Sequence, residues 1–275
     1  MGKERILITV KTYPTLSQKY GEVVCTAGVR PDGSWVRMYP VPFRRLDQKQ
    51  QYRKYDWLEC GLVRNTTDHR PESFRPTDIN EIHAIGHVGT GDAWSERRAL
   101  VLRTAKVYTR LKDLIDGAKA NTLSLAVFSP TRVLDFTWEE DERTWNLERL
   151  RQAREHFKQL DLFEDNRWRE TFNMIPKLPY NFSYTFEDAG GRRSTLQVLD
   201  WEAGALYWNC LKSCDGDEGC ALAKVRQKYF DTFLGTDLHF FLGTTQQWHS
   251  VAPNPWVIVG VFPIPCEQQQ KLFAP

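Results

Sequence analysis

The sequence predicts a mixed α+β protein with two structural parts. A small, barrel-like or curved sheet with helices is expected in the amino-terminal part, because its first 64 residues alternate short apolar runs with turn residues. A mixed sheet with two helices is expected in the carboxy-terminal part, where alternating and continuously apolar strands flank two segments of helical period. We place the division between the parts at residue 160, which gives units of 1–160 and 161–275.

Short strands dominate the first part. We predict strands at 6–11, 21–29, 35–39 and 55–64, and the Pro-Asp-Gly-Ser turn at 31–34 makes 22–39 a β-hairpin. Four short strands with tight links are typical of a strongly curved sheet or a barrel. Residues 65–92 contain several Pro and Gly residues, and we expect them to be irregular.

The middle of the chain is predicted to be mainly helical. Apolar residues recur at helical spacing over 94–119, and the opposite face of that helix is basic. Strands at 124–128 and 132–138 follow, separated by Ser129 and Pro130. A charged amphipathic helix over 144–159 then leads into an expected linker at 160–179.

The carboxy-terminal part begins with an aromatic strand. Tyr, Phe, Tyr and Phe alternate with small polar residues over 180–186, and this strand is predicted to form a hairpin with 194–199. Its four rings form either a core wall or a stacking platform, and the core wall is the expectation because neighbouring helices need a surface to cover. Helices at 201–213 and 219–234 and buried strands at 238–242 and 256–262 complete the predicted sheet.

The charge distribution points to a polyanionic partner. The net charge of the chain is +2, but residues 1–119 hold 21 Lys and Arg against 14 Asp and Glu. A basic part beside an acidic part is typical of proteins that bind nucleic acid, although a solvated basic surface would give the same count. We expect a nucleic-acid partner, DNA rather than RNA.

One face of the strand at 35–39 is the main candidate for that interaction. With period two, Trp35, Arg37 and Tyr39 share a face, while Val36 and Met38 take the other. Aromatic rings offer stacking surfaces to unpaired bases, and Arg and Lys bind phosphate. The alternative is that the rings belong to the core and Arg37 pairs with an acid. The further cations expected to contact phosphate are Arg44, Arg45, Arg53, Lys54, Arg103 and Arg110.

Two places could carry catalysis. Asp200 and Glu202 lie at a strand end, where a carboxylate could act as a general base, but Asp200 could equally cap the helix that begins at residue 201. His249 follows an apparent strand and could be a base near neutral pH, or simply a structural histidine. The chain lacks the motifs of P-loop enzymes, Rossmann enzymes, zinc proteases, α/β-hydrolases and zinc deaminases.

The cysteines do not indicate a disulfide scaffold or a strong metal motif. The spacing of Cys210, Cys214 and Cys220 differs from that of a zinc knuckle, so incidental thiols are favoured over zinc or a labile disulfide. Cys25 and Cys60 are expected to be reduced core thiols. We predict no metal and no cofactor. Without a signal-peptide pattern or an apolar run long enough for a membrane span, we also expect a cytoplasmic protein with no membrane partner.

These observations lead to one main hypothesis and several alternatives. The chain is expected to bind nucleic acid and to recognise unpaired or modified bases by ring stacking and phosphate contacts. The alternatives are an enzyme that hydrolyses the glycosidic bond of a flipped base, a small-molecule enzyme, or a module that binds another protein. Whether the chain turns over a substrate, and its oligomeric state, do not follow from the sequence.

Overall fold

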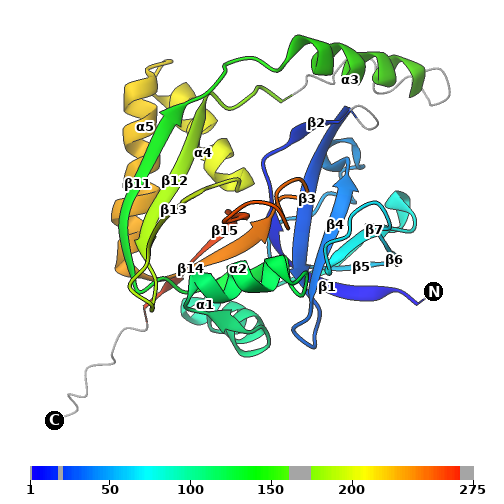
Figure 1. Ribbon diagram of the computed structural model, residues 1–275. Coiled ribbons are helices and arrows are strands. Elements are labelled where there is room, and N and C mark those ends of the chain that lie inside the picture. Colours follow the sequence, from blue (N-terminus) through cyan, green and yellow to red (C-terminus); the bar gives the residue numbers. More distant parts are fainter. Residues whose placement is uncertain (1, 18–20, 161–174, 267–275) are drawn as a thin grey trace.

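The computed structural model describes residues 2–17, 21–160 and 175–266, and the chain folds as the mixed α+β protein that its sequence predicts. The amino-terminal sheet is curled and has the strand order β6-β7-β4-β3-β1-β5-β8, with β2 paired to β3 (Figure 1). Its strands are β1 Glu4–Lys11, β2 Thr15–Ser17, β3 Gly21–Val29, β4 Trp35–Val41, β5 Asp56–Cys60, β6 Leu62–Arg64, β7 Ser73–Pro76 and β8 His83–His87.

The predicted β3–β4 hairpin is present, and its turn is formed as the sequence indicates. The Asp32 carboxylate accepts a hydrogen bond of 2.9 Å from the backbone N–H of Ser34. Gly33 adopts a φ of +82°, where a Cβ atom would lie 2.0 Å from the carbonyl oxygen of Thr104. Gly is therefore required at this position, both for backbone conformation and for space.

The segment at 65–92 is not wholly irregular, as was predicted, because it contains β7 and β8. Strand β7 pairs in parallel with β4 and antiparallel with β6, while β8 extends the other end of the sheet through β5. Both strands are short, and β8 is exposed along its whole length. They form through long-range pairing and carry little apolar alternation that sequence reasoning could detect.

The carboxy-terminal strands form two sheets rather than the single one predicted. The first has the order β15-β14-β10-β9 and the second β11-β12-β13, and an isolated bridge between Val198 and Ile258 joins them. Their strands are β9 Val107–Tyr108, β10 Leu125–Phe128, β11 Arg132–Glu140, β12 Tyr180–Glu187, β13 Arg193–Gln197, β14 Thr236–Thr244 and β15 Trp256–Pro265. Because residues 107–140 pair with these later strands, the sheets divide the chain near residue 105, earlier than the expected division at 160.

The predicted helix over 94–119 is interrupted. Helix α1, Gly91–Arg98, continues as a π-helical turn to Arg103, and α2 begins only at Leu111 and ends at Lys119. Between them Val107 and Tyr108 extend and pair with Val127 and Phe128 of β10. A strand partner therefore outweighs the helical period here, because a β-branched and an aromatic side chain pack well in a sheet.

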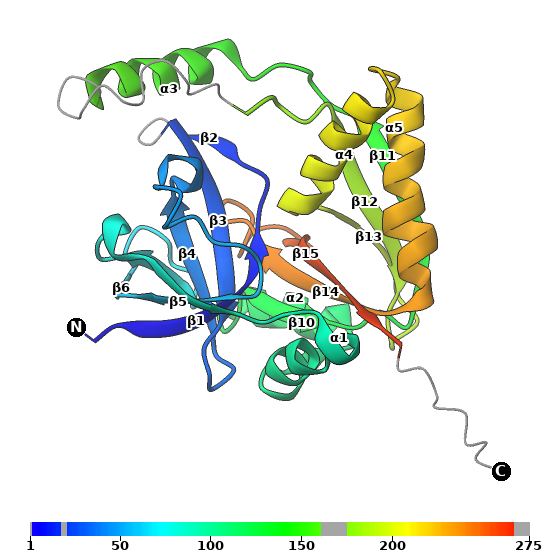
Figure 2. The ribbon, with the colours of Figure 1, turned by 180° about the vertical axis from the view of Figure 1, so that it is seen from behind.

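Three further helices complete the fold. Helix α3, Leu147–Leu160, lies against β2 and β3 at the top of the molecule (Figure 1), and the expected linker at 160–179 lies mostly outside the described residues. Helices α4, Trp201–Ser213, and α5, Glu218–Arg226, agree with the predicted pair, and α5 continues as a π-helical turn to Thr232. Both pack along the three-stranded sheet (Figure 2). Short 3₁₀ turns occur at Phe43–Arg45, Ile79–Glu81 and Phe233–Gly235.

The β14–β15 sheet is buried on both faces and separates two cores. Phe240 and Leu242 contribute to the core shared with the three-stranded sheet, whereas Phe241 and Val259 contribute to the core shared with the curled sheet. A third core lies on the opposite face of the curled sheet, where Ile6 and Ile8 of β1 alternate with Leu7. This double burial explains why β14 and β15 are continuously apolar in sequence.

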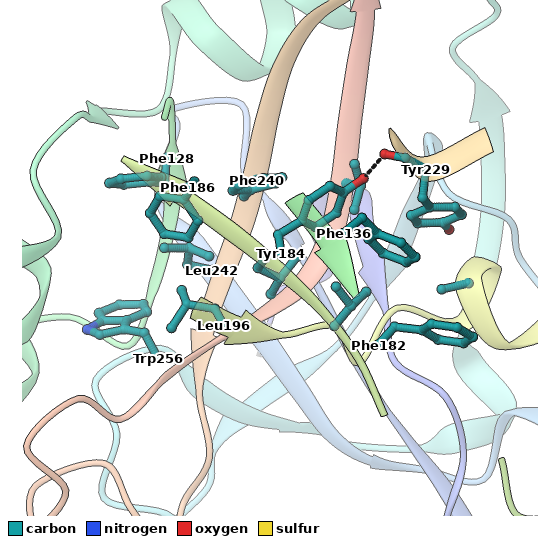
Figure 3. Packing of buried hydrophobic residues seen from close by; sticks show 14 of the residues in the cluster. Phe128, Phe136, Phe182, Tyr184, Phe186, Leu196, Tyr229, Phe240, Leu242 and Trp256 are labelled. Atoms are coloured by element: carbon teal, nitrogen blue, oxygen red, sulfur yellow. Dashed lines mark hydrogen bonds between the residues drawn. The ribbon is translucent and has the colours of Figure 1, made fainter. Parts of the chain in front are cut away.

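The aromatic face of β12 is a core wall. Tyr180, Phe182, Tyr184 and Phe186 are all at most 5% exposed. Figure 3 shows Phe182, Tyr184 and Phe186 packed with Phe136 of β11 and Phe240 of β14. The stacking-platform alternative is therefore excluded for this face.

The carboxy-terminal cysteines are partly paired. Cys214 and Cys220 form a disulfide across the turn between α4 and α5, so the expectation of incidental thiols there was wrong. Cys25, Cys60 and Cys210 are free thiols. Within the described part of the chain, no group of three His, Cys, Asp or Glu side chains could hold a metal ion, and no helix is long and apolar enough to cross a membrane.

Candidate functional site

A cavity of about 870 Å³ lies between the curled sheet and the carboxy-terminal sheets. Its walls are mainly apolar, and each half of the molecule contributes to them. Val10 comes from β1, Leu125 from β10, and Val257 and Val259 from β15. Val257 and Val259 face the cavity because alternate residues of β15 point to opposite faces, which leaves Trp256 and Ile258 in the other core.

Arg37 lies at the floor of this cavity. It stands in the middle of β4 and is only 1% exposed. Its guanidinium donates to Ser124 Oγ at 2.6 Å and to the Ser124 carbonyl oxygen at 2.9 Å. Among the described residues no carboxylate lies within ion-pair distance of Arg37, and burial together with the nearby Arg70 lowers its pKa to about 10.

Arg70 stands beside Arg37, and the carbonyl oxygen of Thr244 accepts from both guanidiniums. Asp68 holds Arg70 through a bidentate pair, with Nε–Oδ1 at 2.8 Å and Nη2–Oδ2 at 2.5 Å. Burial alone would raise the pKa of Asp68, but hydrogen bonds from Arg70 and Ser73 lower it to about 2. Asp68 is therefore ionised throughout the physiological pH range.

A second carboxylate reaches Arg37 through a serine. Glu72 accepts from the Ser124 backbone N–H at 3.0 Å and from Ser124 Oγ at 2.5 Å. Because the same Ser124 Oγ accepts from Arg37, the hydroxyl group transmits the negative charge of Glu72 to the guanidinium. The floor is thus a cluster of two guanidiniums and two carboxylates, and its formal charges balance.

His69 is the histidine that lines the cavity, and His249 lies behind it. His69 is exposed, and its ring centroid is 5.6 Å from that of His249. His249 is completely buried, and its ring nitrogens contact Thr244 Oγ1 at 2.8 Å and Asn121 Oδ1 at 2.9 Å. Burial and the charge of Arg70 lower its pKa to about 4, so His249 is neutral at physiological pH. Both nitrogens are engaged, which favours the structural role over that of a general base.

Asp200 caps α4 and forms a buried ion pair with Lys54. Its carboxylate accepts from the backbone N–H of Glu202 at 3.2 Å, and Lys54 Nζ lies 2.7 and 2.8 Å from its two oxygens. Burial opposes the charge of Lys54, but Asp200 and Glu202 outweigh it and raise the pKa of Lys54. Lys54 is only 7% exposed, so it is not a surface cation that could contact phosphate.

The candidate aromatic residues of β4 have different surroundings. The Trp35 ring packs edge-to-face on Phe241, with centroids 6.0 Å apart, in the core between the sheets. Tyr39 lines the cavity, and its carbonyl oxygen accepts from Asn65 at 3.1 Å. The predicted face is therefore real, but it points inward: Trp35 belongs to a core, and Arg37 and Tyr39 belong to the cavity.

The remaining candidate cations lie away from the cavity lining. Arg44 pairs with Glu22 at 2.8 Å, and Arg110 is 3.5 Å from Asp113. The side chain of Arg53 is 75% exposed, while Arg103 is exposed and Arg45 is half-buried. The structure therefore does not bring these five arginines together with Arg37 and Tyr39.

The rim of the cavity contains residues that sequence reasoning did not single out. Trp145 donates through Nε1 to the Ile175 carbonyl oxygen at 2.9 Å, and Lys177 pairs with Asp141 at 2.7 Å. Arg149 stands on the first turn of α3 and also lines the cavity. Trp145 and Lys177, like His69 and Arg70, come from connecting segments, whereas Arg149 belongs to α3. The Asp-His-Arg run at 68–70 is the local signal that could have identified His69 and Arg70 as binding residues, because loops often supply such residues.

Two family models match the sequence. Residues 2–103 match a domain of unknown function, DUF8758, and residues 107–275 match a second domain of unknown function, DUF8757. No curated protein matches the sequence. Both matched segments contribute to the cavity lining, the first through Arg37 and Arg70 and the second through Val257 and Val259. The candidate site is therefore built where the two segments meet, which is a common location for ligand sites.

Proposed function

The chain belongs to the family of the domain of unknown function DUF8757, and we propose that it binds nucleic acid by admitting one unpaired or modified nucleotide, more readily from DNA than from RNA, to the cavity. The observation that carries this proposal is the combination of apolar walls with two arginines at the floor. A flat base is favoured between apolar side chains, and its polar edge requires hydrogen-bond donors or acceptors at the end of the cavity.

The size and the rim of the cavity support a nucleotide as the occupant. A volume of about 870 Å³ lies in the range of ligand sites and accommodates a base with its sugar. Arg149 is exposed at the rim, where phosphates would remain when a base enters. Because only backbone contacts of this kind depend strongly on salt, binding should weaken as salt rises.

The carboxylates on the lining favour binding over hydrolysis. Asp141 and Asp200 each form an ion pair with a lysine, and Asp200 is also sequestered as a helix cap. A carboxylate that attacks a glycosidic bond, or activates water beside it, needs access to the substrate. We therefore propose recognition of the base without cleavage.

Filling the cavity tests the proposal without touching a polar group. Val257 is half-buried and lines the cavity, so Val257→Phe should occupy space that the base needs and weaken binding of an oligonucleotide with one unpaired base about tenfold or more. The measurement is fluorescence anisotropy with labelled single strands, bulged duplexes and perfect duplexes over a salt series.

Val63→Phe is the matched control. Val63 lies on the edge strand β6 and does not line this cavity, so the same substitution there should leave affinity unchanged. Circular dichroism of both variants establishes that they fold. Wild-type affinity in a folded Val257→Phe protein would contradict the proposal, as would equal affinity for bulged and perfect duplexes.

A further inference from the structure

We propose that the cavity floor selects a 6-oxopurine, that is guanine or hypoxanthine, over adenine and thymine. The inference rests on the proposed function and names the class of base that the cavity accepts. Its basis is the hydrogen-bond inventory of the floor, in which donors remain after every internal bond is counted.

Arg37 has one donor left. A guanidinium carries five N–H groups. Within the described residues, the Nη1 and Nη2 groups of Arg37 donate hydrogen bonds to Ser73, Ser124 and Thr244. The Nε–H has no acceptor among those residues, and Arg37 lines this cavity. The Nε–H is therefore the group that a ligand can satisfy.

Arg70 contributes further donors. Its Nε–H and one N–H of Nη2 bind Asp68, and one N–H of Nη1 binds the Thr244 carbonyl oxygen. Two N–H groups remain by the same count. The neighbouring acceptors are already engaged. Asp68 accepts hydrogen bonds from Arg70 and Ser73, and the Thr244 carbonyl oxygen accepts from both arginines. The floor is thus rich in donors and poor in acceptors.

The charge balance of the floor favours a neutral base edge over an anion. Asp68 and Glu72 already balance Arg37 and Arg70, and their carboxylates would repel a phosphate placed beside them. The apolar walls also disfavour a group that needs hydration. A carbonyl oxygen and a ring nitrogen satisfy the free N–H groups without bringing in charge.

Among the bases, the 6-oxopurines present two adjacent acceptors, O6 and N7, which Arg binds in pairs. Adenine presents the N6 amino group between N1 and N7, so neither of those edges offers two adjacent acceptors. The amino group of adenine would therefore face another donor and leave buried N–H groups unpaired. Thymine carries its two carbonyl groups on either side of the N3–H donor, so it presents no two adjacent acceptors to the floor.

The test is a series of otherwise identical bulged duplexes with one unpaired guanine, hypoxanthine, adenine, cytosine, thymine or 7-deazaguanine. We expect guanine and hypoxanthine to bind about tenfold or more tightly than adenine. 7-Deazaguanine keeps the ring and O6 but lacks N7, so its affinity should fall toward that of adenine. At constant ionic strength, inorganic phosphate should not displace bound free guanosine.

Two variants locate the selectivity. Arg37→Lys keeps the charge but removes the Nε–H, so guanine and adenine should then bind within about threefold of each other. Arg149→Lys, at the rim, should preserve the preference for guanine. Thermal denaturation establishes that both proteins fold, and if Arg37→Lys does not, the base series on the wild-type protein decides alone.

The outcomes separate this inference from the proposed function. Equal affinity for all six bases, with binding still weakened by Val257→Phe, would overturn the base selectivity and leave the proposed function standing. Displacement of free guanosine by inorganic phosphate at constant ionic strength would also overturn the inference, because the floor would then be an anion site. If the wild-type protein bound free guanosine but none of the oligonucleotides, the proposed function alone would be overturned.

Discussion

Replacing Lys54 by Met is expected to lower the free energy of unfolding by about 3–5 kcal/mol, because it leaves the buried carboxylate of Asp200 without its partner. The side chain of Asp200 is completely buried, and that of Lys54 is 5% exposed. Glu202 adds a second negative charge, since its Oε2 lies 2.9 Å from Lys54 Nζ. Urea denaturation of wild type and variant measures the difference.

The stability lost when Lys54 is replaced by Met should depend on pH. Burial raises the pKa of Asp200, and removal of Lys54 raises it further. As the pH falls, Asp200 in the folded variant takes up a proton before the unfolded chain does, and the uncompensated charge disappears. The difference in free energy of unfolding between wild type and Lys54→Met should therefore be smaller at about pH 5 than at about pH 8.

The exposed pair of Lys3 and Glu81 provides the control for this substitution. Their side chains are 45% and 53% exposed, and solvent screens such pairs. Lys3→Met should leave the unfolding curve unchanged. If Lys54→Met were as stable as Lys3→Met, the buried pair would not hold the curled sheet to α4.

Phe136→Ala is expected to destabilise the protein by about 3–5 kcal/mol, because it opens a hole in the aromatic core. The Phe136 ring is completely buried, and its centroid lies 5.6 Å from that of Phe182, 4.9 Å from Tyr184 and 5.5 Å from Tyr229 (Figure 3). The three-stranded sheet joins β14 and the helices through these rings. Urea denaturation again gives the difference.

Trp248→Ala is the comparison for that prediction. This substitution removes an even larger ring than Phe136→Ala does. Trp248 is 51% exposed, however, so its replacement should change the free energy of unfolding by less than about 0.5 kcal/mol. Equal effects of the two substitutions would contradict the assignment of the β12 aromatic face to the core.

Much of the fold follows from local patterns in the sequence. The β3–β4 hairpin is specified by its turn residues, and the helices α4 and α5 by their helical period and by the caps Asp200 and Asp217. The aromatic alternation of β12 correctly predicts a buried face. These features depend on residues close in sequence, which is why they can be read without the structure.

The remaining features depend on contacts between distant segments. Strand β9 interrupts a helical pattern because β10 offers it a partner, and β7 forms because β4 does. Arg37 has the alternation of an exposed strand face, yet β14 and the start of β10 cover it. No local pattern distinguishes a face that meets solvent from one that meets a second sheet.

The candidate site shows the same division. The sequence directs attention to Arg37, Tyr39 and Asp200, and all three line the cavity. It places them on an exposed surface or in a catalytic role, whereas the structure shows recessed groups that are largely hydrogen-bonded. Arg70 and His69 enter the site because the loop at 68–70 folds against Thr244 and His249, more than 170 residues away.

Photocross-linking tests most directly whether a base enters the cavity. A bulged duplex with 6-thioguanine at the unpaired position is bound to the protein and irradiated, and mass spectrometry locates the linked residue. We predict adducts on the cavity lining, in the peptides that contain Tyr39, Gln246 or Val257. Adducts confined to the outer cations, such as Arg103 and Arg110, would contradict the account and place the nucleic acid on the surface instead.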